Sequence, residues 1–344
     1  MQLDYPIIDG DGHVVDLDRE IRKYLPEKYH RIPDNREYPV WPQEPWAFGV
    51  SDLYKQDVPS FEMWLSFLEE SGISATVLFP SNALTHGVIR RVDWAIDTAH
   101  AYNDWLYDQF SARSERLKGV ALLPVQDVKA ASEELERCVR GYGFVGGMLP
   151  SVTSPLKGLG SREFDLLYST AVRLDTMLAV HGGAIGGLAF AEGLHSYREV
   201  RVLKHLIPQQ IQLTNMISQG VFDRFPELRV AYLEAGCGWV LFLMDMLDEQ
   251  FERKGAQDLH KKPIEYLKSD NIFFSFESQE RLLPCFIESL GAHKLIWASD
   301  YPHERPRSAF FEDLPNFFER KDISEQSRRT ILYESSKRLY RMAI

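Results

Sequence analysis

Residues 118–150, KGVALLPVQDVKAASEELERCVRGYGFVGGMLP, contain a complete strand–helix–strand unit. Two short apolar runs, 118–124 and 144–150, end in proline and do not alternate with polar residues. Such runs are typical of parallel strands that are covered on both faces. Between them, residues 128–139 carry apolar side chains at helical spacing, which predicts an amphipathic helix. This stretch therefore indicates an α/β fold with a parallel sheet.

The same alternation extends over the rest of the chain. The other strand-like runs are 5–11, 75–80, 176–181, 229–234, 272–276 and 294–300. The other segments with helical period are 61–70, 92–110, 163–173, 200–222, 239–252, 280–290 and 324–341. Eight strands that alternate with helices predict a (β/α)8 TIM barrel. An open doubly wound sheet is the alternative, but no GxGxxG or GxxxxGK[ST] motif follows a strand.

Two long insertions depart from this repeat. Residues 16–59 follow the first strand and are rich in Pro, Trp and Tyr, and residues 182–197 follow the fifth strand and are rich in Gly and Ala. Both leave the carboxyl ends of strands, where barrel enzymes build their active sites from loops. We expect one barrel domain over residues 1–344, with 16–59 as a lid-like insertion.

The composition excludes several classes of protein. The chain has 39 Lys and Arg against 50 Asp and Glu, and the net charge of −11 argues against a nucleic-acid or membrane partner. No apolar run has the roughly 20 residues of a membrane span, and the start lacks the features of a signal peptide. Three cysteines are too few for a disulfide framework. We therefore expect a cytoplasmic protein.

Potential metal ligands and acid–base groups gather at the ends of the predicted strands. Asp11 and His13 follow the first strand, and the later strands end in His181, Glu234 and Asp300, with His303 just beyond. A closed barrel would bring these ends to one mouth. Asp11 and His13 stand two residues apart, so both side chains point to the same side of a strand. Imidazole and carboxylate ligands suit zinc, manganese or iron(II) better than calcium or magnesium.

Each of these residues also has a purely structural interpretation. His181 alone could be a hydrogen-bonded structural histidine, Asp300 could cap a turn, and Glu234 could pair with a nearby cation. However, candidate ligands occur at three strand ends of one predicted barrel. This combination favours a metal site over separate structural roles.

Four stretches resemble the amidohydrolase superfamily. They are DGDGH (9–13), VHG (180–182), GVFDRFPELRVAYLEAGCGW (220–239) and ASDYPH (298–303). They are similar to the branch that includes aminocarboxymuconate semialdehyde decarboxylase and the resorcylate and dihydroxybenzoate decarboxylases. The resemblance implies a distorted TIM barrel with metal ligands at Asp11, His13, His181 and Asp300. Binuclear members carry a lysine after strand 4, where this chain has 148–150, Met-Leu-Pro, so we expect a single divalent ion, zinc first and manganese or iron as alternatives.

The chain departs from this branch at strand 6. Its decarboxylases have a histidine at that strand end, whereas this chain has Glu234, which can move protons but cannot replace an imidazole. We therefore expect metal-dependent hydrolysis, in which Asp300 accepts a proton from the activated water and Glu234 and His303 are further acid–base groups. Non-oxidative decarboxylation of an aromatic or enoic acid is the alternative. A catalytically silent ligand-binding barrel is a third hypothesis.

Substrate contacts are expected from three loops. Trp46 and Phe48, in the first insertion, could form an aromatic wall for a small aromatic or carboxylated substrate, or could pack the loop onto the barrel. The segment after strand 2 and the end of strand 7 offer further candidates: Ser81, Asn82, His86 and Glu277. We interpret His205, in a predicted helix, as structural. Residues 239–253 are apolar on more than one face, which predicts a homodimer contact.

Overall fold

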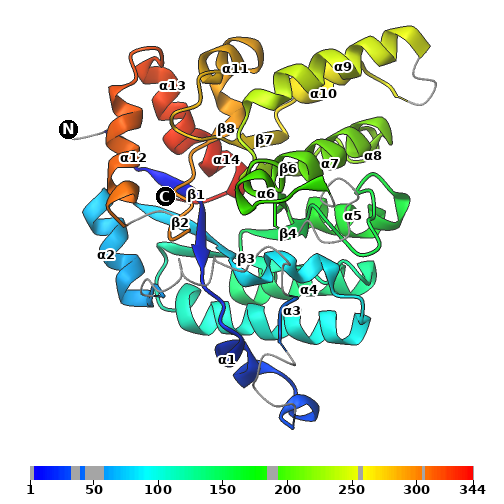
Figure 1. The fold of residues 1–344 in the computed structure, drawn as a ribbon, viewed down its shortest axis with the longest axis vertical. Helices are drawn as coiled ribbons and strands as arrows, with labels where there is room; N and C mark the ends of the chain where they lie inside the picture. The colour runs from blue at the N-terminus through cyan, green and yellow to red at the C-terminus, as the bar shows by residue number, and fades with distance from the viewer. Residues whose placement is uncertain are drawn as a thin grey trace.

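A computed structural model describes residues 4–31, 39–42, 58–183, 193–254, 259–303 and 307–343. Eight parallel strands form one sheet whose spatial order follows the sequence (Figure 1). They are β1 Ile8–Val14, β2 Ala75–Pro80, β3 Leu117–Leu122, β4 Gly146–Pro150, β5 Met177–His181, β6 Arg229–Leu233, β7 Ile272–Ser275 and β8 Leu295–Ile296. The predicted eight-stranded α/β barrel is confirmed.

Backbone hydrogen bonds close the ring between β1 and the segment that follows β8. The Gly10 N–H donates to the Trp297 carbonyl (2.9 Å), and the Asp300 N–H donates to the Asp11 carbonyl (3.0 Å). The His13 N–H reaches the Tyr301 carbonyl in the same way (2.8 Å). The first and last candidate site residues therefore become neighbours, although nearly 300 residues separate them in the sequence.

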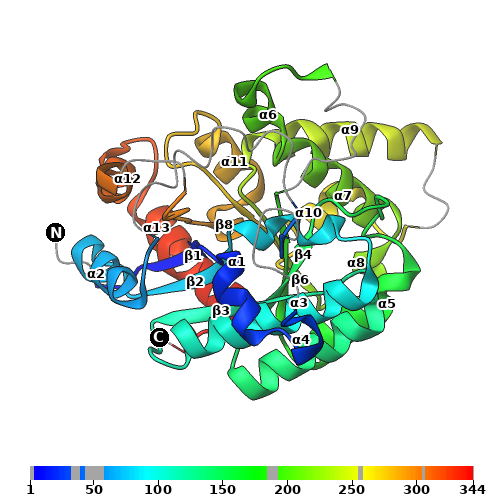
Figure 2. The same cartoon turned by 60° about the horizontal axis from the view of Figure 1, so that its bottom comes forward.

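Helices surround the strands on the outside of the ring (Figure 2). Their bounds are α1 Asp18–Ile21, α2 Phe61–Ser71, α3 Val92–Leu106, α4 Val128–Tyr142, α5 Asp165–Arg173, α6 Tyr197–Leu203, α7 Leu206–Ser218, α8 Val221–Arg224, α9 Gly238–Lys254, α10 Pro263–Lys268, α11 Leu283–Leu290, α12 Arg307–Glu319, α13 Glu325–Arg329 and α14 Ser335–Tyr340. None of the helices in the described ranges is both long and apolar enough to cross a membrane.

Burial explains the two sequence patterns. All six residues of β2, ATVLFP, are buried, because helices cover one face of the strand and the barrel interior covers the other. In α4, by contrast, Ala131, Leu135 and Cys138 are buried on one face while Gly141 is exposed. The continuous and the periodic apolar patterns therefore correspond to strands and helices as predicted.

The main differences from the prediction lie at element ends. The predicted helix 200–222 is divided into α6, α7 and α8, and Gly220 precedes α8 in the left-handed conformation with φ 66°. The predicted last strand, 294–300, pairs with β7 only over Leu295–Ile296, and later residues turn toward β1. The first strand continues beyond the predicted end at Asp11 to Val14, which places His13 within it. α10 and α12 were not predicted.

Part of the first insertion packs on the barrel. Trp41 is almost fully buried, and its Nε1–H donates to the Asp16 carbonyl (3.0 Å). Trp46 and Phe48 lie outside the described residues, so the aromatic wall and the lid-like role of 16–59 stay predictions. The single-domain assignment and the homodimer also stay predictions. On α9, Phe242 is 68% exposed.

Candidate functional site

Four predicted ligands converge at the carboxyl ends of the strands. Asp11 Oδ1 lies 3.3 Å from His13 Nε2 and 3.4 Å from His181 Nε2. His13 Nε2 also lies 3.6 Å from Asp300 Oδ1. These side chains come from β1, from the end of β5 and from the turn after β8, and all four are buried. The barrel therefore brings together the residues that the strand-end pattern singled out.

The ring hydrogen bonds of both histidines direct a lone pair into this cluster. His13 Nδ1–H donates to the Pro80 carbonyl (2.8 Å), and His181 Nδ1–H donates to the Gly182 carbonyl (2.7 Å). A carbonyl oxygen only accepts, so a neutral ring carries its hydrogen on Nδ1 and its lone pair on Nε2. Both Nε2 atoms and Asp11 Oδ1 are buried without a hydrogen-bond partner among the described residues.

These orphaned atoms fit a divalent cation. Ligand atoms about 2.1 Å from a shared ion lie about 3.0 to 3.4 Å apart in octahedral or tetrahedral geometry. The separations of 3.3 and 3.4 Å around Asp11 Oδ1 agree with that spacing. Carbonyl groups that hold the opposite ring nitrogen are also the usual second contacts of metal-binding histidines. The residues present can therefore hold one ion.

Charges within the cluster favour a bound cation or bound protons. Burial alone would lower the pKa of His13, but the carboxylates of Asp11 and Asp300 overcome this effect and raise it to about 9. Burial likewise opposes the charged form of His181, yet Asp11 raises its pKa. The negative charge of this site is thus balanced by protons on the imidazoles, and a metal ion would replace those protons.

Asp9 fixes the turn that carries Asp300. Asp9 is fully buried and accepts hydrogen bonds from the Ser299 N–H (2.8 Å), the Ser299 hydroxyl (2.7 Å) and the Thr76 hydroxyl (2.7 Å). Asp300 itself adopts the left-handed conformation with φ 53°. That conformation costs a non-glycine residue about 1–2 kcal/mol, and such strain is common at functional sites. Burial raises the pKa of Asp300 to about 7.

His303 and Ser81 extend the site beyond Asp300. His303 Nδ1–H donates to Asp300 Oδ1 (2.8 Å), and His303 Nε2 lies 2.7 Å from the Ser81 hydroxyl, which can donate to it. The His303 ring is also stacked at a tilt on the His13 ring, with centroids 4.0 Å apart. Two predicted residues, His303 and Ser81, therefore form one hydrogen-bonded chain with Asp300.

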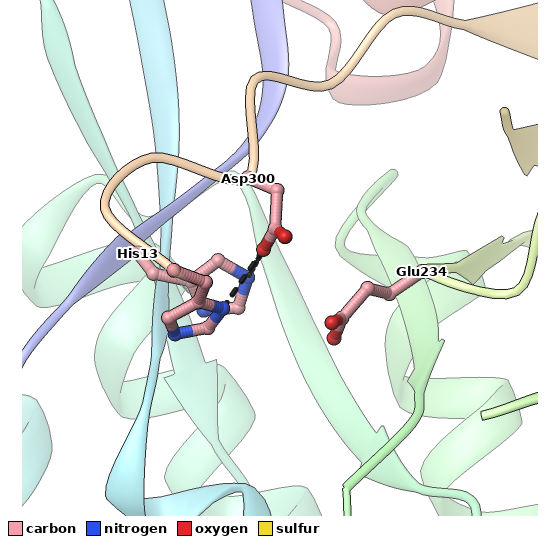
Figure 3. A group of neighbouring side chains, drawn as sticks. His13, Glu234 and Asp300 are labelled. Carbon is pink, nitrogen blue, oxygen red and sulfur yellow. Dashed lines mark hydrogen bonds and ion pairs between the residues drawn. The ribbon is translucent and has the colours of Figure 1, made fainter. Parts of the chain in front are cut away.

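Glu234 faces the cluster from the end of β6. Figure 3 shows its carboxylate pointing toward His13 and Asp300 from across the site. Glu234 also has a left-handed backbone, with φ 59°. Burial raises the pKa of Glu234, and the charge of Asp300 raises it further. Glu234 is therefore suited to hold a proton close to the four predicted ligands.

The remaining predicted substrate contacts have no hydrogen bond to the four predicted ligands among the described contacts, or lie outside the described residues. Asn82 Nδ2 donates to the Asp16 carbonyl (3.2 Å), within the loop after β2. His86 is fully buried, its Nε2–H donates to the Ala95 carbonyl (2.9 Å), and burial lowers its pKa to about 4. Glu277 is exposed, and its charge helps to raise the pKa of Asp300. Trp46 and Phe48 are not described.

Sequence reasoning missed three residues near the site, Asp9, Asp16 and Arg201, and interpreted a fourth, His205, as structural. Asp9 and Asp16 are buried carboxylates with supporting roles, and Asp16 accepts the backbone N–H groups of residues 81–83. Arg201 and His205 approach Glu234 from α6 and the α6–α7 junction. The one available signal for His205 was its spacing of four from Gln209, which places both polar residues on one helix face.

Comparison with known proteins places these observations in a family. The amidohydrolase family matches residues 8–342. The gamma-resorcylate decarboxylase of Polaromonas sp. is 23% identical over 286 residues, which cover 80% of this chain and 85% of the relative. The 2-keto-4-carboxy-3-hexenedioate hydratase of Sphingobium sp. is 22% identical and covers 97% of this chain and 96% of its own length.

A solved structure shares the fold. It is a dihydroxybenzoic acid decarboxylase from Polaromonas sp. with bound manganese and the inhibitor 2-nitroresorcinol. The two structures superpose with a TM-score of 0.76 at 20% identity, and the match covers 98% of this chain and 97% of the other. The resemblance inferred from the strand-end motifs is therefore confirmed at the level of family and fold.

Proposed function

Since the chain belongs to the amidohydrolase family, we propose that it is a metal-dependent decarboxylase of a hydroxylated aromatic acid. The observation that carries the proposal is the buried set of Asp11, His13 and His181, whose ligand atoms are orphaned, with Glu234 facing it. The decarboxylase relatives favour this alternative over the hydrolysis that we expected first. Hydrolysis stays unconfirmed.

In this proposal Asp11, His13, His181 and Asp300 hold one divalent ion. The bound ion would supply positive charge that binds and orients the carboxylate of the acid and an adjacent oxygen. Manganese becomes the first expectation in place of zinc, because the Polaromonas decarboxylase structure contains it. The imidazole and carboxylate ligands are compatible with either metal.

Decarboxylation needs a proton at the carbon that carries the carboxylate. When that carbon takes the proton, the bond to the carboxylate breaks, its electron pair returns to the ring, and carbon dioxide leaves. One proton is consumed in each turnover. Glu234 is the proposed donor, because its carboxyl group faces the site and its raised pKa favours the protonated form. Asp300, held by His303, lies across the same space.

The test separates carbon dioxide release from reactions that add water. Manganese-loaded protein is incubated with 2,6-dihydroxybenzoate and a panel of hydroxybenzoates and enoic acids in oxygen-18 water. We expect carbon dioxide and an organic product without the label, because decarboxylation adds only hydrogen to the carbon skeleton. Label in the organic product would indicate hydrolysis or hydration and would contradict the proposal. A chain that cannot be loaded with metal would support the silent barrel instead.

A further inference from the structure

We propose that His205 is the positioning partner of Glu234, and that the two side chains form a carboxyl–imidazole pair that delivers the proton. The inference rests on the proposed decarboxylation. The imidazole comes from the junction of α6 and α7, and its Nδ1 lies 3.4 Å from the carboxylate of Glu234, which follows β6.

The first observation is an unsatisfied buried imidazole. The side chain of His205 is only 5% exposed, and its Nδ1 lies 3.4 Å from Glu234 Oε2. Three buried atoms have no hydrogen-bond partner among the described residues: both ring nitrogens of His205 and Glu234 Oε2. Leaving a buried polar group unpaired costs about 1–3 kcal/mol, so such groups in a native protein call for an explanation. A small closing movement would make the hydrogen bond from Nδ1–H to Oε2.

The second observation is that the backbone is shaped to admit this ring. Gly182 directly follows the β5 ligand His181, and a Cβ atom at Gly182 would clash with His205 Nδ1. One helical turn after His205, Gln209 donates a hydrogen bond to the Leu233 carbonyl, which ties α7 to the end of β6. The imidazole is thus held between Gly182, at the end of β5, and Glu234, at the end of β6.

The two oxygens of Glu234 have different neighbours. Arg201 Nη1 lies 3.3 Å from Oε1 and donates to it, whereas Oε2 lies 3.4 Å from His205 Nδ1 and 3.9 Å from His181 Nδ1, which donates to the Gly182 carbonyl. A guanidinium always carries its protons, so it stabilises negative charge on Oε1. The proton that Glu234 delivers therefore belongs on Oε2, and once it has left, the negative charge on Oε2 is stabilised by the Nδ1–H group of His205. Asp300 with His303 forms a second carboxylate–imidazole pair across the site.

The proton balance of this pair is simple. Glu234 transfers its proton to the ring carbon of the acid as the bond to carbon dioxide breaks. His205 keeps its own proton and holds the resulting carboxylate through Nδ1–H to Oε2. Glu234 regains its proton from solvent before the next turnover. His205 itself does not touch the substrate, so it should affect the rate of the chemical step and leave substrate binding unchanged.

The pairing can be tested without substrate or metal. In metal-free protein labelled with ¹⁵N-histidine, we expect the His205 ring signals to report hydrogen on Nδ1 in the wild type. Glu234→Gln should shift those signals or mix the tautomers, because an amide replaces the accepting carboxylate. Glu249→Gln, on exposed α9, is the matched control and should leave them unchanged. The signals that disappear in the His205→Asn variant are assigned to His205. Unchanged signals in Glu234→Gln would overturn the proposed pair.

Kinetics then test the function of the pair. With the acid that the wild type decarboxylates, His205→Asn and His205→Gln should lower kcat about 100-fold with KM within about twofold and unchanged metal content. Both should also slow solvent-deuterium exchange into the product arene, which is the reverse of the protonation step. His293→Gln, at the amino end of β8, is the control and should retain wild-type values.

Retention of kcat within about twofold in both His205 variants would overturn the inference. Failure of the proposed function looks different, because the wild type itself would then release no carbon dioxide from any acid. In that case the histidine signals still decide whether Glu234 and His205 are paired.

Discussion

Lys294 is a buried charge at the end of the barrel opposite the candidate site. It is fully buried just before β8, and its Nζ atom has no hydrogen-bond partner among the described residues. Burial lowers the pKa of Lys294 to about 7, although the charge of Asp270 partly opposes the shift. An ammonium group in this position destabilises the folded state, because it loses hydration without gaining a partner.

This property predicts how the stability of the protein depends on pH. Below about pH 7 both the folded and the unfolded chain carry the Lys294 proton, and the burial penalty is complete. As the pH rises toward 10.5, the unfolded chain keeps a proton that the folded chain has lost, so the penalty is relieved. Lys294→Met should therefore raise the free energy of unfolding by about 1–4 kcal/mol at pH 7 and by less at pH 9.5.

Urea unfolding of both proteins at pH 7 and pH 9.5 checks this prediction. Titration of all other groups cancels in the difference between wild type and variant. Lys337→Met is the control, because Lys337 is exposed, and it should show no such pH-dependent gain. Equal differences at both pH values for Lys294→Met would contradict a neutral buried lysine.

At the scale of one element, α4 shows how backbone conformation limits the choice of residue. Its N-cap Asp127 accepts a hydrogen bond from the Ala130 N–H, and Gly143, the residue that caps its carboxyl end, has φ 68°. Gly141 lies within the helix, and a Cβ atom added there meets nothing within 4 Å. The two glycines thus differ in conformation while both are exposed.

The two glycines of α4 should respond in opposite directions to alanine. Gly141→Ala should stabilise the protein by about 0.5–1 kcal/mol, because alanine loses less conformational entropy in a helix. Gly143→Ala should destabilise it by about 1–2 kcal/mol, because a Cβ atom is strained in the left-handed conformation. Chemical denaturation measures both, and each variant is the control for the other. A gain in stability at both positions would contradict the assigned end of α4.

At the scale of the whole molecule, the proposed metal would tie together the two ends of the chain. Its ligands come from β1, from β5 and from the turn after β8, so an unfolded chain does not present them together. Binding to the folded state alone stabilises it by about 2.7 kcal/mol when the free metal is 100 times its Kd. Manganese should therefore raise the Tm of metal-free protein by several degrees.

This shift in Tm is measured by differential scanning calorimetry with and without manganese, after removal of bound metal with a chelator. Asp11→Asn should lose most of the shift, because the amide cannot supply the charge of the central ligand. Glu249→Gln should keep it. A manganese shift of wild-type size in Asp11→Asn would contradict the proposed ligand set.

Much of the fold could be predicted from the sequence because strand and helix patterns are local. Continuous apolar runs identified all eight strands, and β2 was predicted at its observed bounds, Ala75–Pro80. The element ends were predicted less accurately, and the single predicted helix 200–222 is divided into α6, α7 and α8. Those ends depend on contacts and on left-handed residues such as Gly220, which a periodic pattern does not reveal.

The sequence by itself determined the barrel, the family and the residues Asp11, His13, His181, Glu234 and Asp300 at its strand ends, since chain order in a barrel fixes which ends meet. The tertiary structure alone decided which atoms of these residues are left without partners, and that His205 lies behind Glu234. The physical reason is that partner atoms and burial depend on distances between segments far apart in sequence. A residue such as His205, at the junction of two helices, has the same local sequence pattern whether its side chain faces a core or a carboxylate.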